Sequence, residues 1–185
     1  MKEIAVLDMG CGNGNFLLRC RNEWGQKSAP LAGIDLMESR IENLKRKAPF
    51  LDVHTGSADE LPWDDNLFDL AHQSMLFSSV LDEKLRRDIA REMQRIIKPG
   101  GRVLWYDFIW NPMNKSSVGI PFSLVRSYFP DWVIEQHRRI TLPPPIARPL
   151  LRISESLVTV LEACRIFNCF ELILLRKPAG PSAKP

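Results

Sequence analysis

A chain of 185 residues, 45% of them hydrophobic, is long enough to bury one core and too short for two ordinary domains. Its 25 basic and 22 acidic residues leave a formal charge of +3, which gives no electrostatic argument for a nucleic-acid partner but does not exclude an anionic substrate. No apolar run approaches the roughly 20 residues that span a bilayer, so we expect no transmembrane segment and leave peripheral membrane contact open. We predict one domain over residues 1–178 and a flexible tail at 179–185.

Strand-like and helix-like segments alternate over about the first 110 residues, which is typical of a parallel sheet with helices on both faces. In chain order we expect strand 4–10, helix 15–25, strand 31–36, helix 38–49, strand 51–57, loop 58–67, strand 68–76, helix 81–101 and strand 102–110. Asp82 can cap the start of the helix at 81–101, and the Lys98–Gly101 run is expected to end it.

The sequence pattern changes after residue 110, where proline and polar residues interrupt the alternation of strand-like and helix-like segments. In chain order we expect loop 111–121, helix 122–130, strand 135–142, a linker PPPIARP, an apolar helix at 150–167 and strand 168–177. The two strands could form an antiparallel pair that closes one edge of the sheet. Core packing is the favoured explanation for the apolar helix, and membrane contact is the alternative.

The cysteines are Cys11, Cys20, Cys164 and Cys169, and none of them is spaced as C-x-x-C from another. No export signal precedes them, and a cytoplasmic protein keeps its thiols reduced. We therefore expect a cytoplasmic location, free thiols and no metal site.

A glycine-rich stretch, VLDMGCGNGNF, leads from the first strand into the first helix. Such a loop presents backbone N–H groups and a positive helix end to a ligand. The dinucleotide pattern G-x-G-x-x-G fails because Asn15 stands where the third glycine would be, and no Gly-Lys-Ser or Gly-Lys-Thr follows as in a phosphate loop. The loop therefore suits an adenosine-bearing ligand other than a dinucleotide, with a purely structural turn as the alternative.

Two acids narrow the choice of ligand. Asp8 precedes the first glycine by two residues and is suited to an ammonium group rather than a pyrophosphate. Asp35 ends the second strand, where a carboxylate can accept from both hydroxyls of a ribose, although it could also cap the next helix. A ligand with ribose and an amino group but no phosphate fits both acids, and S-adenosylmethionine is such a molecule.

With these residues in place, the chain resembles the class I S-adenosylmethionine-dependent methyltransferases. The matching pieces, in the family's order, are VLDMGCGNG, GIDLMESR, GSADELPWDDNLFDL and REMQRIIKPGGRVLWYDF. The resemblance implies a Rossmann-like, doubly wound α/β sheet of seven strands, mostly parallel, with an antiparallel last strand. It also implies S-adenosyl-L-methionine as the cofactor, S-adenosyl-L-homocysteine as its product, and no metal.

When the family's cofactor contacts are carried over to the matching positions of this chain, the resemblance implies a set of contact residues. Those that would shape the methionine end are Asp8, Gly10, Cys11, Gly12 and Gly14. Asp35 would hold the ribose, while Leu36, Ala58 and Asp59 would contact the adenine and Gln73 would lie beside the sulfonium and methionyl groups. Asp59 could instead be a simple turn residue.

Methyl transfer needs alignment more than a nucleophile, but a hydroxyl acceptor would benefit from a general base. The candidates are His72, Tyr106, Asp107 and His137. His72 is as well explained as a satisfied core histidine. The basic group Arg138, Arg139, Arg148 and Arg152 beside His137 could meet a phosphate or an acidic sugar, or form a solvated face.

The segments WYDFIWNPMN and ITLPPPIARPLLRISESL resemble a bacterial, type 11-like group of the family that is often linked to cell-surface polysaccharides. We therefore expect a small molecule or a glycan or lipid-linked acceptor, with O-methylation favoured. The alternative is a cofactor-binding module with little turnover. An RNA methyltransferase is disfavoured because QSML stands where an Asn-Pro-Pro-Tyr type motif would follow the fourth strand.

The chain begins only a few residues before Val6, whereas relatives normally carry a helical segment there that helps to close the site. We expect an N-terminal helix to be missing and the pocket to be more open than usual. Such a pocket would favour a homodimer.

Overall fold

The computed structural model describes residues 3–27, 29–110, 116–142, 144–164 and 168–180. Its seven strands form one sheet in the order β3-β2-β1-β4-β5-β7-β6. The strands are β1 Val6–Met9, β2 Leu31–Asp35, β3 Asp52–Thr55, β4 Phe68–Ser74, β5 Ile97–Phe108, β6 Val133–Ile140 and β7 Phe170–Arg176. The helices are α1 Asn15–Asn22, α2 Glu38–Lys47, α3 Leu76–Ser79, α4 Glu83–Ile96, α5 Phe122–Tyr128, α6 Pro144–Leu151 and α7 Glu155–Cys164.

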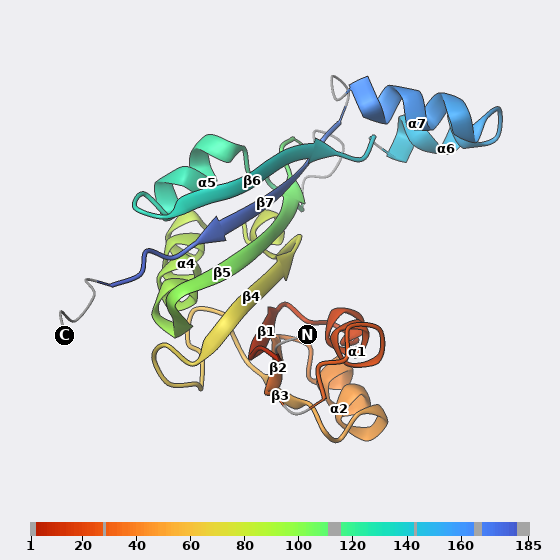
Figure 1. Cartoon of the computed structure of the whole chain (residues 1–185). Helices are drawn as coiled ribbons and strands as arrows, with labels where there is room; N and C mark the ends of the chain where they lie inside the picture. The colour runs from red at the N-terminus through yellow and green to blue at the C-terminus, as the bar shows by residue number, and fades with distance from the viewer. Residues whose placement is uncertain (1–2, 28, 111–115, 143, 165–167, 181–185) are drawn as a thin grey trace.

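The pairing of the strands confirms the predicted fold class. β1 to β5 run parallel to one another, and β7 is antiparallel to both β5 and β6. The predicted antiparallel pair is therefore present at the β6 edge of the sheet (Figure 1). β1 lies between β2 and β4, so the chain reverses its direction of travel across the sheet at this point, and a crevice opens outside the carboxyl ends of these strands.

Both faces of β1 are buried, which explains its uninterrupted apolar sequence. Leu7 and Met9 point into a large core that α4 and α5 cover, whereas Val6 points into a smaller core beneath α1 and α2. Because both faces are buried, β1 is held at one position within the sheet. The glycine loop that follows β1 is therefore held at one position as well.

The junction between α4 and β5 corrects the predicted helix at 81–101. Asp82 caps the helix as expected, since its Oδ1 accepts from the Lys84 amide at 2.8 Å, but the helix ends at Ile96. Ile97 already belongs to β5, pairs with Phe68 and is completely buried. Ile97 has an extended backbone, with φ −82° and ψ 132°, and its pairing with β4 takes the place of another helical turn.

The predicted single helix at 150–167 is also wrong. The structure has two helices, and the segment read as a linker, PPPIARP, is helical from Pro144, because proline is tolerated in a first helical turn. Figure 1 shows α6 and α7 side by side beyond the ends of β6 and β7, away from the sheet. Leu151, Ile153 and Val160 are at least half exposed there, so this pair does not cover the sheet as expected. Residues 165–167, part of the predicted loop at 111–121 and the tail end 181–185 lie outside the described residues.

Candidate functional site

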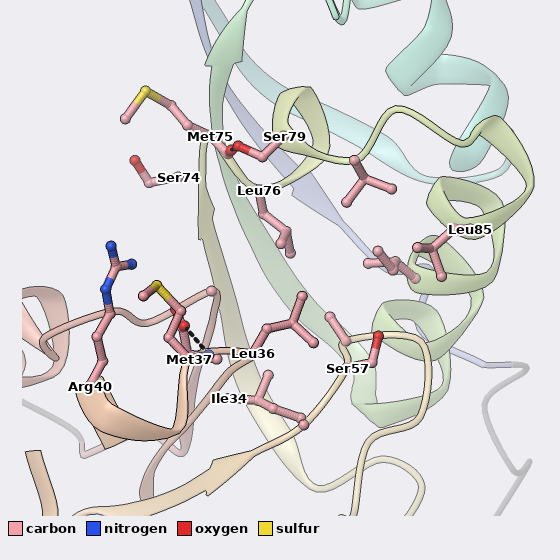
Figure 2. A pocket seen from close by; sticks show the side chains of 16 residues that line it. Ile34, Leu36, Met37, Arg40, Ser57, Ser74, Met75, Leu76, Ser79 and Leu85 are labelled. Atoms are coloured by element: carbon pink, nitrogen blue, oxygen red, sulfur yellow. Dashed lines mark hydrogen bonds between the residues drawn. The ribbon is translucent and has the colours of Figure 1, made fainter. Parts of the chain in front are cut away.

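A cavity of about 370 Å³ opens at the carboxyl ends of β1, β2 and β4 (Figure 2). One side of it is apolar and is formed by Ile34, Leu36, Ala58, Leu76, Leu85 and Ile89. Gly10, Asp35, Arg40 and Ser74 add polar groups to the lining, and Figure 2 shows Met37 beside Arg40 and Met75 beside Ser74. An apolar wall that faces a few converging polar groups is the usual form of a small-molecule site.

The glycine loop is tied to the end of β2. The amides of Gly10 and Cys11 both donate to the carbonyl oxygen of Ile34, at 2.8 and 3.0 Å. Gly14 has φ +74° at the start of α1, and a Cβ there would lie 2.6 Å from the Leu44 side chain. Only glycine allows this left-handed turn and the close approach of α2, so the loop is held rigidly against β2.

Asp35 joins the glycine loop to the helix that follows β2. Its Oδ2 accepts from the Gly12 amide at 2.9 Å and its Oδ1 accepts from the Met37 amide at 2.9 Å. Met37 is the N-cap residue of α2 and no side chain caps this helix, so Asp35 orders the turn before α2 rather than capping it, and the Asp35 side chain also lines the cavity. Each oxygen keeps further acceptor capacity for a ligand hydroxyl.

Asp8 lies at the base of the glycine loop and not on the cavity wall. Its carboxylate is almost completely buried and contacts His72, Oδ1 to Nδ1, at 2.7 Å. The His72 ring stacks on Phe16 with 3.8 Å between centroids. His72 is thus partnered and partly buried, and it is not among the described residues that line the cavity.

Gln73 is completely buried and links three elements of the sheet edge. Its Nε2 donates to the Tyr106 carbonyl at 3.4 Å, and its Oε1 accepts from the Leu76 amide at 3.1 Å. The cavity is lined instead by the next residues, Ser74 and Met75. Met75 has φ +57°, which ends β4 two residues earlier than predicted and starts α3.

The loop after β3 supplies Ser57 and Ala58 to the cavity. Asp59 points to the Ser57 hydroxyl, which donates to its Oδ1, so it orders the loop from behind the lining residues. Leu36 is 72% exposed, and Met37 and Met75 are also exposed at the mouth of the cavity. Exposed apolar side chains around a pocket mouth are suited to covering a flat, apolar ligand group.

Asp107 is completely buried at the end of β5. It accepts from the amides of Ser78, at 3.1 Å, and Phe108, at 2.9 Å, so it anchors α3 to the sheet. Burial raises the pKa of this carboxyl from 3.8 to about 6, against the lowering effect of its hydrogen bonds. Asp107 is not among the described residues that line the cavity.

The other two candidate bases lie farther along the sheet. Tyr106 stacks on Phe170 with 4.9 Å between ring centroids and pairs in register with Ser74, a residue of the cavity. His137 lies on the edge strand β6, stacks on Phe122 and contacts Glu171 at 3.2 Å. None of the four candidates is among the described residues that line the cavity.

Glu171 was not anticipated from the sequence. It is 1% exposed, and burial raises the pKa of its carboxyl while His137 and then Arg139 act in the opposite direction. Arg139 lies 3.9 Å from this buried acid while its own side chain stays exposed on β6, so the contact and the solvated face occur together. Arg148 belongs to α6, which lies beyond the end of β6 (Figure 1).

The thiols near the site, Cys11 and Cys20, are buried. Burial, followed by the charges of Asp8 and Asp35, raises the pKa of Cys11 to about 12, and burial raises that of Cys20 to about 11. The Cys11 side chain packs against Gly33 in the core, so only its backbone faces the loop. Within the described residues, no three His, Cys, Asp or Glu side chains are grouped as metal ligands, and no helix is long and apolar enough to cross a bilayer.

Several lining residues were missed in the sequence, among them Met37, Arg40, Ser74 and Met75. The available signal was positional. Ser74 is the last residue of β4 and Met75 follows it, while Met37 and Arg40 are the N-cap and a first-turn residue of α2, just after β2. All four lie at the edge where open sheets bind ligands.

The model of the family described as "Methyltransferase domain" matches residues 6–101, which carry the glycine loop, Asp35 and the Asp59 loop. The demethylmenaquinone methyltransferase of Listeria welshimeri is 31% identical over 107 residues, or 55% of this chain and 44% of the relative. That of Staphylococcus aureus strain MRSA252 is 33% identical over 107 residues, with 56% and 42% covered. The chain thus matches less than half the length of these curated relatives.

Solved structures share the fold across almost the whole chain. The cyclase SpnF has a TM-score of 0.71 at 17% identity, covering 96% of this chain and 76% of its own. An S-adenosylmethionine-dependent methyltransferase from Mesorhizobium loti has a TM-score of 0.69 at 16% identity, covering 95% and 91%. Identities this low show the fold alone.

Proposed function

Because the chain belongs to the methyltransferase domain family, with the class I S-adenosylmethionine-dependent fold, we propose that it binds S-adenosylmethionine and methylates a small-molecule acceptor. The observation that carries this proposal is Asp35. Its carboxylate ends β2, lines the cavity and is held in place by the Gly12 and Met37 amides. A fixed acceptor pair at this position is suited to a ribose diol.

The residues present fit the cofactor. Leu36 and Ala58 form part of an apolar compartment of the right character for adenine, and Gly10 lies at the polar end where the methionyl group would enter. When bound, S-adenosylmethionine supplies a methyl group activated by its sulfonium. The chain's own contribution is to orient the reactants and exclude water, for which Met75 and Leu76 are placed at the cavity wall.

For the acceptor we propose a small organic molecule, with O-methylation as the favoured chemistry. The names of the curated relatives support a quinone-like acceptor, and the sequence features beyond the shared core support a glycan or lipid-linked one. Of the four candidate bases we favour Tyr106, because it pairs in register with Ser74 of the cavity.

Calorimetric titration tests the cofactor, with S-adenosylmethionine, S-adenosylhomocysteine and NAD as ligands. We expect the first two to bind and NAD not to compete with them. Tighter binding of NAD would overturn the proposal. Transfer of a radiolabelled methyl group to quinone, glycan-lipid or small-molecule fractions then identifies the acceptor class.

A binding module with little turnover is the second candidate. Two observations favour it: none of the four candidate bases is among the described lining residues, and SpnF shares the fold although it is named a cyclase. Cofactor binding without methyl transfer to any fraction would support this function over the first.

We also propose that two copies of the chain associate. One face of β5 and β7 carries the half-buried side chains of Leu104, Tyr106, Leu172 and Leu174. In the part of the chain that the structure describes, no helix lies over this face (Figure 1). Light scattering should give twice the mass of the chain, and Leu174→Glu should halve it. A monomeric wild-type protein would contradict the proposal.

A further inference from the structure

Arg40 carries an unpaired positive charge at the polar end of the cavity. It lies in the first turn of α2, and Figure 2 shows its guanidinium directed across the cavity mouth toward Ser74. Its Nη1 atom is 3.8 Å from the point where a side chain on Gly12 would begin. The guanidinium has no ion-pair or hydrogen-bond partner within the described ranges.

Asp35, the acid that lines the same cavity, does not neutralise this charge. Both oxygens of Asp35 are directed to backbone amides, those of Gly12 and Met37, and no ion pair joins Asp35 to Arg40. The cavity therefore offers at one end both an acceptor for hydroxyl groups and, beyond it, a donor for an anion.

The two ends of the cavity orient a bound ligand. Leu76, Leu85 and Ile89 give the cavity an apolar part. Figure 2 shows Leu85 on the opposite side from Arg40, with Leu76 between them. If the purine of a ligand lies in the apolar part of the cavity and its ribose lies on Asp35, the rest of the ligand extends toward the glycine loop. In S-adenosylmethionine that part ends in an α-carboxylate, which is the only anionic group of the molecule.

We propose that Arg40 binds the α-carboxylate of S-adenosylmethionine and so selects ligands that carry it. This inference rests on the proposed function and assigns a specificity-determining residue within the same site. A guanidinium can pair with a carboxylate through two parallel hydrogen bonds, which gives direction as well as charge. A surface arginine without such a role would leave affinity unchanged when it is removed.

The test compares S-adenosylmethionine with its decarboxylated analogue by calorimetric titration. The variant is Arg40→Met, which keeps the length and apolar stem of the side chain. Arg46→Met is the matched control, because Arg46 is also exposed on α2, has no described partner and does not line the cavity. Circular dichroism verifies that both variants are folded.

We expect the wild-type protein and Arg46→Met to bind S-adenosylmethionine about tenfold or more tightly than the analogue. Arg40→Met should lose most of this preference by weakening S-adenosylmethionine binding alone. Equal weakening of both ligands, or no change, would overturn the inference while leaving the proposed function intact. Failure of the wild-type protein to bind either ligand would contradict the proposed function itself.

Discussion

Asp35 of the cavity wall and Gly12 of the glycine loop are joined by a 2.9 Å hydrogen bond from the Gly12 amide to Oδ2. The same carboxylate accepts from the first amide of the turn into α2. One acid thus sets the distance between the glycine loop and the helix that form the polar end of the site.

Replacing Asp35 with Ala should weaken S-adenosylmethionine binding by about 1 to 3 kcal/mol, because charge-assisted bonds to the ribose and the support of the loop are lost together. Calorimetric titration measures the change. Asp64→Ala is the control, since Asp64 is an exposed loop acid outside the cavity, and it should bind as the wild type does. An unchanged affinity in Asp35→Ala would reject the ribose assignment.

Gly14→Ala should destabilise the fold by about 2 to 4 kcal/mol, because it combines a left-handed backbone with a clash against Leu44. Gly25→Ala separates the two effects, since Gly25 also has a positive φ, +71°, but has nothing within 4 Å of its added Cβ. It should cost only about 1 kcal/mol. Urea unfolding measures both, and equal losses would show that contact with Leu44 is unimportant.

Asp107 should make the protein less stable as the pH rises from about 4 to about 6. Its pKa is raised from 3.8 when unfolded to about 6 when folded, so the folded state holds the proton longer and each step upward in this window favours unfolding. The full effect is about 3 kcal/mol. Asp107→Asn should remove this slope from urea unfolding measured across the window.

The control for this pH effect is Glu171→Gln, because burial raises the pKa of Glu171 in the same direction. Each variant should remove only the part of the pH dependence of the unfolding free energy that its own carboxyl group contributes. If the slope survives in Asp107→Asn and disappears in Glu171→Gln, Asp107 is not the group responsible.

Cys11 and Cys20 should resist alkylation in the folded protein at about pH 8, because burial raises their pKa values to about 12 and about 11. Iodoacetamide followed by peptide mass spectrometry reads each site separately. The same peptides should be labelled fully in concentrated urea. Labelling of Cys11 in the native state would mean that the glycine loop opens readily.

Much of the site could be predicted from the sequence, because the motifs that indicate it are short and local. The glycine loop and Asp35 each follow a recognisable strand, and the structure places both at the cavity. The order of strands and helices also predicted the sheet, including its antiparallel edge, since hydrophobic patterning directly reflects burial.

What the sequence by itself determined was the fold class and the edge of the sheet at which a ligand binds. Only the tertiary structure decided which side chains face that ligand, because adjacent residues at a strand end point to opposite sides. Gln73 is buried while Ser74 lines the cavity, and Asp107 holds α3 rather than facing the cavity. The role inferred for Arg40 also required the tertiary structure. Whether a charge is paired depends on its neighbours in space, which the order of residues does not show.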